Sequence, residues 1–277
     1  MGAWIMAGVT FREAARKKLL LMALLAGAAF IALFSTGLHF QVKDFNAHHN
    51  TPPIIATEVL RGMIMVGLYA VDLMAVVLTV LTSVDTLSGE ISSGTIQAVA
   101  TKPVSRRQIL LGKWMGFVGM LTVYVALMVG ALSGMAYWES GITARHLVLG
   151  ACLIWLECVL MLNLTLFFGT TFSTLTNGVL ALGLHGIAFL GGWIEQIGAT
   201  LHSPRTVTLG IVSSVIMPSE SLWRRATFEM QSPIASTLHV SPFLNASVPS
   251  RAMVVYGGIY LLAALLMAVR RFGRRDL

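Results

Sequence analysis

Two acidic residues, Asp72 and Glu157, lie deep within long apolar stretches of this 277-residue sequence. An ionised carboxylate at the centre of a lipid bilayer costs about 2.5 to 3.5 kcal/mol on insertion scales. That cost is tolerated where the carboxylate lies on a substrate path or at a gate. It also disappears where the group is protonated or hydrogen-bonded between packed helices. The sequence leaves a functional and a structural role open for both residues.

The other residues that could perform chemistry do not form a recognisable site. His48 and His49 are adjacent, but a metal site needs further ligands,. Cys152 and Cys158 are six positions apart on one predicted helix, so they face different sides and no disulfide is expected,. His185 is expected to be a hydrogen-bonded histidine within a helix bundle. We therefore predict no catalytic residue and no metal site in this chain.

The elements that carry these residues are predicted to be transmembrane helices. Hydrophobic residues make up 56% of the sequence, charged residues 11%, and the mean hydropathy is +0.79. Soluble domains carry about 25% charged residues, whereas about 20 apolar residues cross a bilayer as a helix. The predicted fold class is therefore an all-α integral membrane protein. Six spans are expected near residues 19–38, 63–84, 115–137, 147–170, 178–198 and 252–269.

The basic residues predict the orientation of these spans. With both termini in the cytoplasm, the inner segments hold 12 of the 19 lysine and arginine residues, as the positive-inside rule requires. The net charge of +7 is then explained by topology and anionic lipid headgroups, so no nucleic acid partner is expected,.

Two segments outside the spans are also predicted to be helical. Residues 1–18 are amphipathic, and Thr10 with Glu13 matches a capping box, which predicts a helix lying in the inner interface or extending the first span,. In the outer loop, 199–251, the apolar run 206–217 is too short to cross the membrane and is expected to be re-entrant or interfacial. The following run 220–230 is expected to place Trp223 at the interface and Arg224 and Arg225 toward headgroups,.

The polar inner loop 85–113 is predicted to be an ordered docking surface. A short helix over 96–101 would end at the step into Pro103, because the residue before proline avoids the helical region,. Ser105 and Gln108 then match a capping box at the start of the third span. Ile96 and Val99 form an apolar tip beside charged residues, as in the core and rim of a protein interface. A solvated connector is the alternative.

The order of motifs in this loop resembles the first cytoplasmic loop of ABC-2 type transporter permeases. The sequence runs through Glu90, Gly94-Thr95, Pro103 and then Ser105-Arg106-Arg107 to Gly112-Lys113. The "FREAARKK" leader, the six spans and "MPSESLWRR" before the last span are similar to the same family, so the resemblance covers nearly the whole chain. The branch that includes the nitrous-oxide reductase maturation permease is the most similar in appearance.

The resemblance implies the membrane subunit of an ATP-driven exporter in a bacterial cytoplasmic (inner) membrane, working as a homodimer or with a related permease. It implies that the loop contains a coupling helix that binds one of two separate ATPase subunits. This chain has no G-x-x-x-x-G-K-[ST] motif,, so ATP and magnesium are expected in the partner and the chain is not expected to be an enzyme by itself. The residues expected in coupling are Glu90, Gly94, Thr95, Ile96, Val99, Pro103, Arg106 and Arg107.

Two other functions remain open from the sequence. A proton-coupled secondary transporter would use Asp72 and Glu157, although recognisable inverted repeats are lacking,. A membrane assembly subunit without a transport path is also compatible with the sequence. Neither the residues nor the resemblance indicates the transported substrate.

Overall fold

The computed structural model describes residues 2–16, 18–47, 52–92, 105–232, 234 and 246–274. These described residues are almost entirely helical and contain no strand. The helices are α1 (Gly2–Arg16), α2 (Lys18–Ala47), α3 (Pro53–Ser83), α4 (Asp85–Ser92), α6 (Arg106–Ser140), α7 (Leu147–Gly169), α8 (Thr174–Thr200), α9 (Pro204–Ile216), α10 (Ser219–Met230) and α12 (Arg251–Gly273).

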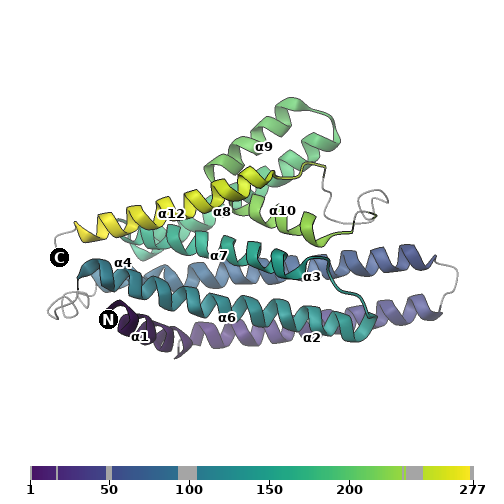
Figure 1. Ribbon diagram of the computed structural model, residues 1–277, viewed down its shortest axis with the longest axis horizontal. Helices are drawn as coiled ribbons and strands as arrows, with labels where there is room; N and C mark the ends of the chain where they lie inside the picture. Colours follow the sequence, from purple (N-terminus) through teal and green to yellow (C-terminus); the bar gives the residue numbers. More distant parts are fainter. Residues whose placement is uncertain are drawn as a thin grey trace.

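Within the described ranges, six helices are long and apolar enough to cross a membrane, which confirms the predicted fold class. They are α2, α3 with its continuation α4, α6, α7, α8 and α12. Figure 1 shows α2, α3, α6 and α7 running alongside one another, while α8 and α12 diverge from them toward α9. The start of α1, the helix α4 and the end of α12 lie at one end of the bundle, which we call the loop end.

Polar side chains on α7 connect the helices in the half of the bundle nearest the loop end. Asn163 accepts a hydrogen bond from the indole of Trp114 on α6 at 2.7 Å and donates one to the carbonyl of Leu261 on α12 at 2.9 Å. The hydroxyls of Thr165 and Ser83 lie 2.6 Å apart and join α7 to α3. Lipid tails are as apolar as leucine side chains, so apolar burial alone does not favour contact between one helix and another. Hydrogen bonds between helices therefore help to specify which helices pack together.

The first helix begins earlier than its sequence motif indicated. The helix α1 starts at Gly2, so Thr10 lies in its interior and the predicted capping box with Glu13 is wrong. Thr10 is instead buried against α6, where a Cβ atom added to Gly116 would come within 2.8 Å of its Cβ. The small residue on α6 thus allows α1 to pack closely against it. The interfacial position of α1 stays a prediction.

The predicted short helices between the fifth and sixth spans are present as α9 and α10. The apolar helix α9 is 13 residues long, and α10 is separated from it by only Met217 and Pro218. Figure 1 shows α10 lying among α7, α8 and α12 rather than along the edge of the bundle. Leu222, Ala226 and Met230 are buried on one face, as their spacing predicted.

Two interfacial side chains of α10 were predicted wrongly. Trp223 is 2% exposed and packs on Tyr69 of α3, with ring centroids 5.1 Å apart. Arg224 is also buried and forms an ion pair with Glu195 of α8 at 2.8 Å. The physical reason is that other helices surround α10: α3 covers Trp223, and α8 and α9 cover Arg224, so both side chains meet protein and not headgroups.

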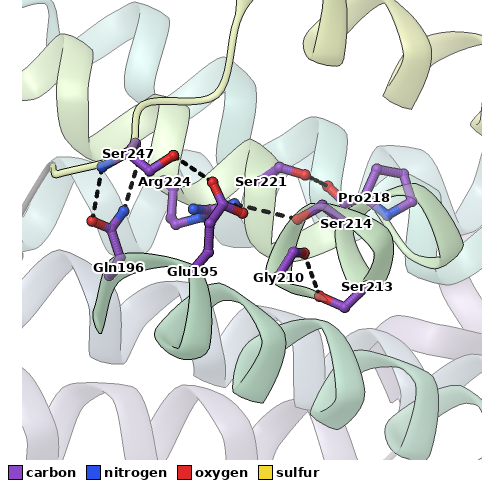
Figure 2. A network of polar contacts seen from close by, with 9 residues as sticks. All are labelled: Glu195, Gln196, Gly210, Ser213, Ser214, Pro218, Ser221, Arg224 and Ser247. Carbon is purple, nitrogen blue, oxygen red and sulfur yellow. Dashed lines mark hydrogen bonds and ion pairs between the residues drawn. The ribbon is translucent and has the colours of Figure 1, made fainter. Parts of the chain in front are cut away.

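A polar network centred on this ion pair holds the segments around α10 together (Figure 2). Arg224 also donates to the Ser214 hydroxyl on α9 at 3.3 Å, and the Ser247 hydroxyl donates to Glu195 at 2.5 Å. Gln196 forms two hydrogen bonds with the backbone of Ser247. The network therefore connects α8, α9, α10 and the segment before α12, and it fixes where α10 begins inside the bundle.

Candidate functional site

The loop end contains the part of the predicted coupling surface that the structure describes. Ser105 caps α6, and its hydroxyl accepts from the Gln108 backbone while the Gln108 side chain accepts from the Ser105 backbone. This confirms the predicted capping box. Arg106 and Arg107 occupy the first turn of α6, with Arg106 half-buried and Arg107 exposed beside Gly273 at the end of α12.

Glu90 of α4 forms an ion pair with Lys113 of α6. The ammonium group of Lys113 is buried and also donates to the carbonyl oxygen of Thr86, at 3.3 Å. The helices α3 and α4 are nearly continuous over Pro53–Glu90, and we call them the α3–α4 rod. These contacts bind the end of this rod to the first turns of α6. The position of α4 is therefore fixed relative to the helix that follows the loop.

A cavity of about 70 Å³ lies beside this ion pair. A cavity needs roughly 10 to 15 Å³ of space of this kind to hold one water molecule, so this cavity is large enough for water. The hydroxyl of Thr174 at the start of α8 donates at 3.0 Å to Asp85, which also lines this cavity. The cavity is lined by Thr10, Glu13, Asp85, Thr86, Glu90, Lys113 and Phe117.

The remaining predicted coupling residues lie outside the residues that the structure describes. They are Gly94, Thr95, Ile96, Val99 and Pro103. The loop from α4 to α6 thus begins and ends at fixed points that Glu90 and Lys113 join. Lys113 was not among the residues expected in coupling. A lysine within the first apolar turns of a span was the available signal, because such a charge needs a partner.

A second group of functional candidates lies in the interior of the bundle, and we call it the acidic cluster. It consists of Asp72 on α3, Glu157 on α7, Glu220 on α10 and His185 on α8. The three carboxylates are 3%, 0% and 6% exposed. Each of them lies close enough to the other two to interact electrostatically. The structure therefore brings together the two acidic residues that the sequence singled out.

Glu220 and His185 are members of this cluster that the sequence did not assign to it. Burial raises the pKa of Glu220 well above its ordinary value, Asp72 adds to that rise, and Arg224 opposes it. His185 lies with its Nδ1 atom 3.1 Å from the Ser219 hydroxyl and 3.7 Å from Glu157. The only sequence signal for Glu220 was its position two residues after Pro218, at the start of a helix.

The side chain of Glu220 packs directly against the backbone of α8 at Gly192. A Cβ atom added to Gly192 would lie 2.6 Å from the Cγ atom of Glu220. The side chain of Glu220 therefore runs across the surface of α8 at a position where a larger residue would displace it.

A search of protein families matches this chain over residues 10–277 to the ABC-2 family transporter proteins. The chain belongs to the ABC-2 family. A comparison with curated proteins finds no match. As an ABC-2 family member with six apolar helices, the chain is a multi-pass membrane component of an ABC transporter and is not itself catalytic. The match does not select a branch of the family, so similarity to the nitrous-oxide reductase branch stays a prediction.

Proposed function

We propose that this chain is the permease subunit of an ATP-driven exporter and that its loop end binds a separate ATPase subunit. The observation that supports this most is the joining of α4 to α6 by Glu90 and Lys113. A segment that transmits force needs rigid attachments on both sides, and both attachments of this loop are helices of the bundle. Membership of the ABC-2 family supports the same assignment.

The proposal has further parts that extend the family assignment. The ATPase partner binds ATP and magnesium, and two copies of it serve two permease halves. The second half is another copy of this chain or a related permease. The complex lies in a bacterial inner membrane with both termini in the cytoplasm, consistent with the basic residues at the loop end,. Substrate moves outward along a path between the halves.

The first experiment is purification of the tagged chain from mildly solubilised membranes, followed by identification of the proteins that co-elute. We expect a stoichiometric ATPase carrying a phosphate-binding loop, and we expect it to be lost when Gly89 to Pro103 is replaced by a Gly/Ser linker. A chain that elutes alone in several detergents, with nucleotide present, would contradict the proposal and favour a proton-coupled transporter.

A charge reversal tests whether the start of α6 takes part in coupling. We expect Arg106→Glu with Arg107→Glu to separate ATP hydrolysis from transport in reconstituted vesicles while the chain still inserts in the membrane. The matched control is Arg270→Glu with Arg274→Glu, which makes the same change of charge at exposed positions of the loop end. Equal coupling in the two double variants would refute a specific role for α6.

The ion pair between α4 and α6 has its own test. Glu90→Lys alone places two positive charges together, and we expect it to reduce transport per ATP hydrolysed. Adding Lys113→Glu restores opposite charges and is expected to recover coupling. Failure of the swapped pair to recover, in a chain that still binds the ATPase, would show that the ion pair does not position the loop.

A further inference from the structure

The acidic cluster contains carboxylate oxygens that have no hydrogen-bond partner. Within the described part of the chain, Asp72 Oδ1 and both carboxylate oxygens of Glu157 are buried without a hydrogen-bond donor. Burying a polar group without a hydrogen bond costs several kcal/mol, and burying an isolated charge costs far more. The cluster cannot hold three ionised carboxylates in this conformation unless something neutralises them.

The nearby basic groups do not provide that neutralisation. Arg224 is the arginine within electrostatic reach of Glu220, and its ion-pair partner is Glu195. Among the described residues, the other ionisable side chains that face the cluster are Tyr69 on α3 and Cys158 on α7, and both are neutral when protonated. Tyr124 of α6 faces Cys158 in turn.

His185 supplies at most one positive charge against three carboxylates. The cluster is therefore left with an excess of at least two negative charges if all three carboxylates ionise. Like charges placed together in a buried site cannot all remain ionised, and the usual solution is that some of them bind protons. The number of protons needed is two with a charged histidine and three with a neutral one.

A metal ion is the other cation that could neutralise such a group. However, no group of three or more His, Cys, Asp or Glu side chains among the described residues has a geometry that could hold one. The carboxylates are dispersed over three helices, and Glu220 is packed tightly over Gly192. A proton needs no such coordination sphere, since it binds a single carboxylate oxygen.

We propose that Asp72, Glu157 and Glu220 form a proton-binding site that is loaded in the conformation seen here and releases protons when the bundle opens to water. Each carboxylate that is neutralised takes up one proton to become a carboxylic acid, and on opening that proton passes to water and leaves the carboxylate hydrated. No oxidant or reductant takes part. The exchange of protons during the transport cycle rests on the proposed ATP-driven function, whereas the loaded state does not.

Because the acidic cluster binds protons in the closed conformation, the equilibrium between the closed bundle and the water-exposed bundle depends on pH. A conformation that binds more protons is favoured at low pH, so alkaline pH shifts the bundle toward the water-exposed state. Opening between α3 and α7 would also affect α10, because its first residue, Ser219, is hydrogen-bonded to His185 of α8, and His185 lies 3.7 Å from Glu157 of α7. The site thereby links the short helix α10 to the two main spans that carry acidic residues.

The loaded state can be tested on the chain alone in lipid nanodiscs by infrared spectroscopy. We expect a protonated-carboxyl C=O band at neutral pH that disappears on alkaline titration. Asp72→Asn, Glu157→Gln and Glu220→Gln should each remove part of the band. The control is Glu229→Gln, which should leave the band unchanged because Glu229 is held as a carboxylate in a separate ion pair with Arg225.

The comparison of variants fails if a substituted chain does not fold. The same infrared measurement is therefore also made on the wild-type chain with isotope-labelled carboxyl groups. Carboxyl-¹³C aspartate and carboxyl-¹³C glutamate, incorporated separately, should each shift a different part of the band. Absence of the band at neutral pH, a shift with neither label, or a stoichiometric metal ion found by elemental analysis would overturn the proton site.

Exchange of protons is measured on the complex with the ATPase. Hydrolysis of ATP itself releases protons, so the release during trapping with ATP and vanadate is compared between the wild-type complex and the Asp72→Asn, Glu157→Gln variant in the same weakly buffered medium. The wild type should release at least one proton per chain more than the variant. Equal release from two complexes that are both trapped would show that the cluster is a static element and would overturn the proposal. If no ATPase binds, the proposed function fails, while the nanodisc measurement still decides the loaded site.

Discussion

Replacing Arg224 with methionine removes the positive member of the buried pair with Glu195 and keeps a side chain of similar length. Removing one partner from a buried ion pair costs about 3 to 5 kcal/mol, because the other charge stays buried. In this protein the Ser247 hydroxyl still donates to Glu195, and two guanidinium nitrogens of Arg224 had no partner to lose. We therefore expect a loss at the lower end, about 3 kcal/mol.

The loss is measured as the free energy of unfolding of the purified chain, titrated with sodium dodecyl sulfate in mixed micelles and followed by circular dichroism. Arg251→Met is the control. Arg251 is exposed at the first position of α12, so its replacement should change the free energy of unfolding by no more than about 0.5 kcal/mol. Equal losses for Arg224→Met and Arg251→Met would refute the reasoning.

A double-mutant cycle separates the pair from the general effect of each substitution. Glu195→Gln in the Arg224→Met background removes the stranded charge and should recover part of the lost stability. We expect a coupling energy of about 1 to 3 kcal/mol, as for residues in direct contact. Additive losses would mean that Arg224 stabilises α10 by packing alone.

Three further substitutions test how the helices are held together. Asn163→Leu leaves the partly buried indole of Trp114 without its acceptor and should lower the free energy of unfolding by about 1 to 3 kcal/mol,; a loss under about 0.5 kcal/mol would contradict this. At Gly210 a Cβ atom would lie 2.7 Å from a carbonyl oxygen of α8, so Gly210→Val should cost about 1 to 3 kcal/mol, whereas Gly130→Val, where nothing lies within 4 Å, should be nearly neutral. Burial would raise the pKa of Glu229, but hydrogen bonds and charges from neighbouring basic groups hold it below its ordinary value. Its stabilising contribution is therefore present above the pKa of the unfolded state and is lost as pH falls through the lowered pKa of the folded state; the stability difference between wild type and Glu229→Gln, measured across the acid range, should shrink accordingly, and a constant difference would refute the assignment.

The six spans were predictable because hydropathy is a local property, and a span must satisfy its own backbone hydrogen bonds within the segment. The start of α6 at Ser105 was predictable for the same reason, since a capping box needs only four consecutive residues,. Thr10 shows the limit of such local signals. Its motif is equally good, but α1 already starts at Gly2, and close packing against Gly116 explains why Thr10 is buried.

Contacts between distant segments could not be read from the sequence. Glu90 and Lys113 stand on either side of a loop, and nothing in their local patterns identifies them as partners. Arg224 was assigned to headgroups because an arginine in a short amphipathic helix usually faces water. That rule fails when other helices cover the polar face, as α8 and α9 do here. Such contacts between helices are visible only in the tertiary structure.

The geometry of α3 relates the two groups of functional candidates to each other. Asp72 and Asp85 are separated by 13 residues of the nearly continuous α3–α4 rod, about 20 Å at 1.5 Å per residue. Near the loop end this rod is bound to α7 through the hydroxyls of Ser83 and Thr165, 2.6 Å apart. If the loop end binds an ATPase as proposed, a displacement of α4 that tilts the rod about this contact would move Asp72 relative to Glu157. In the proposed mechanism, movement at the loop end and exposure of the acidic cluster are thus two consequences of one rotation of α3.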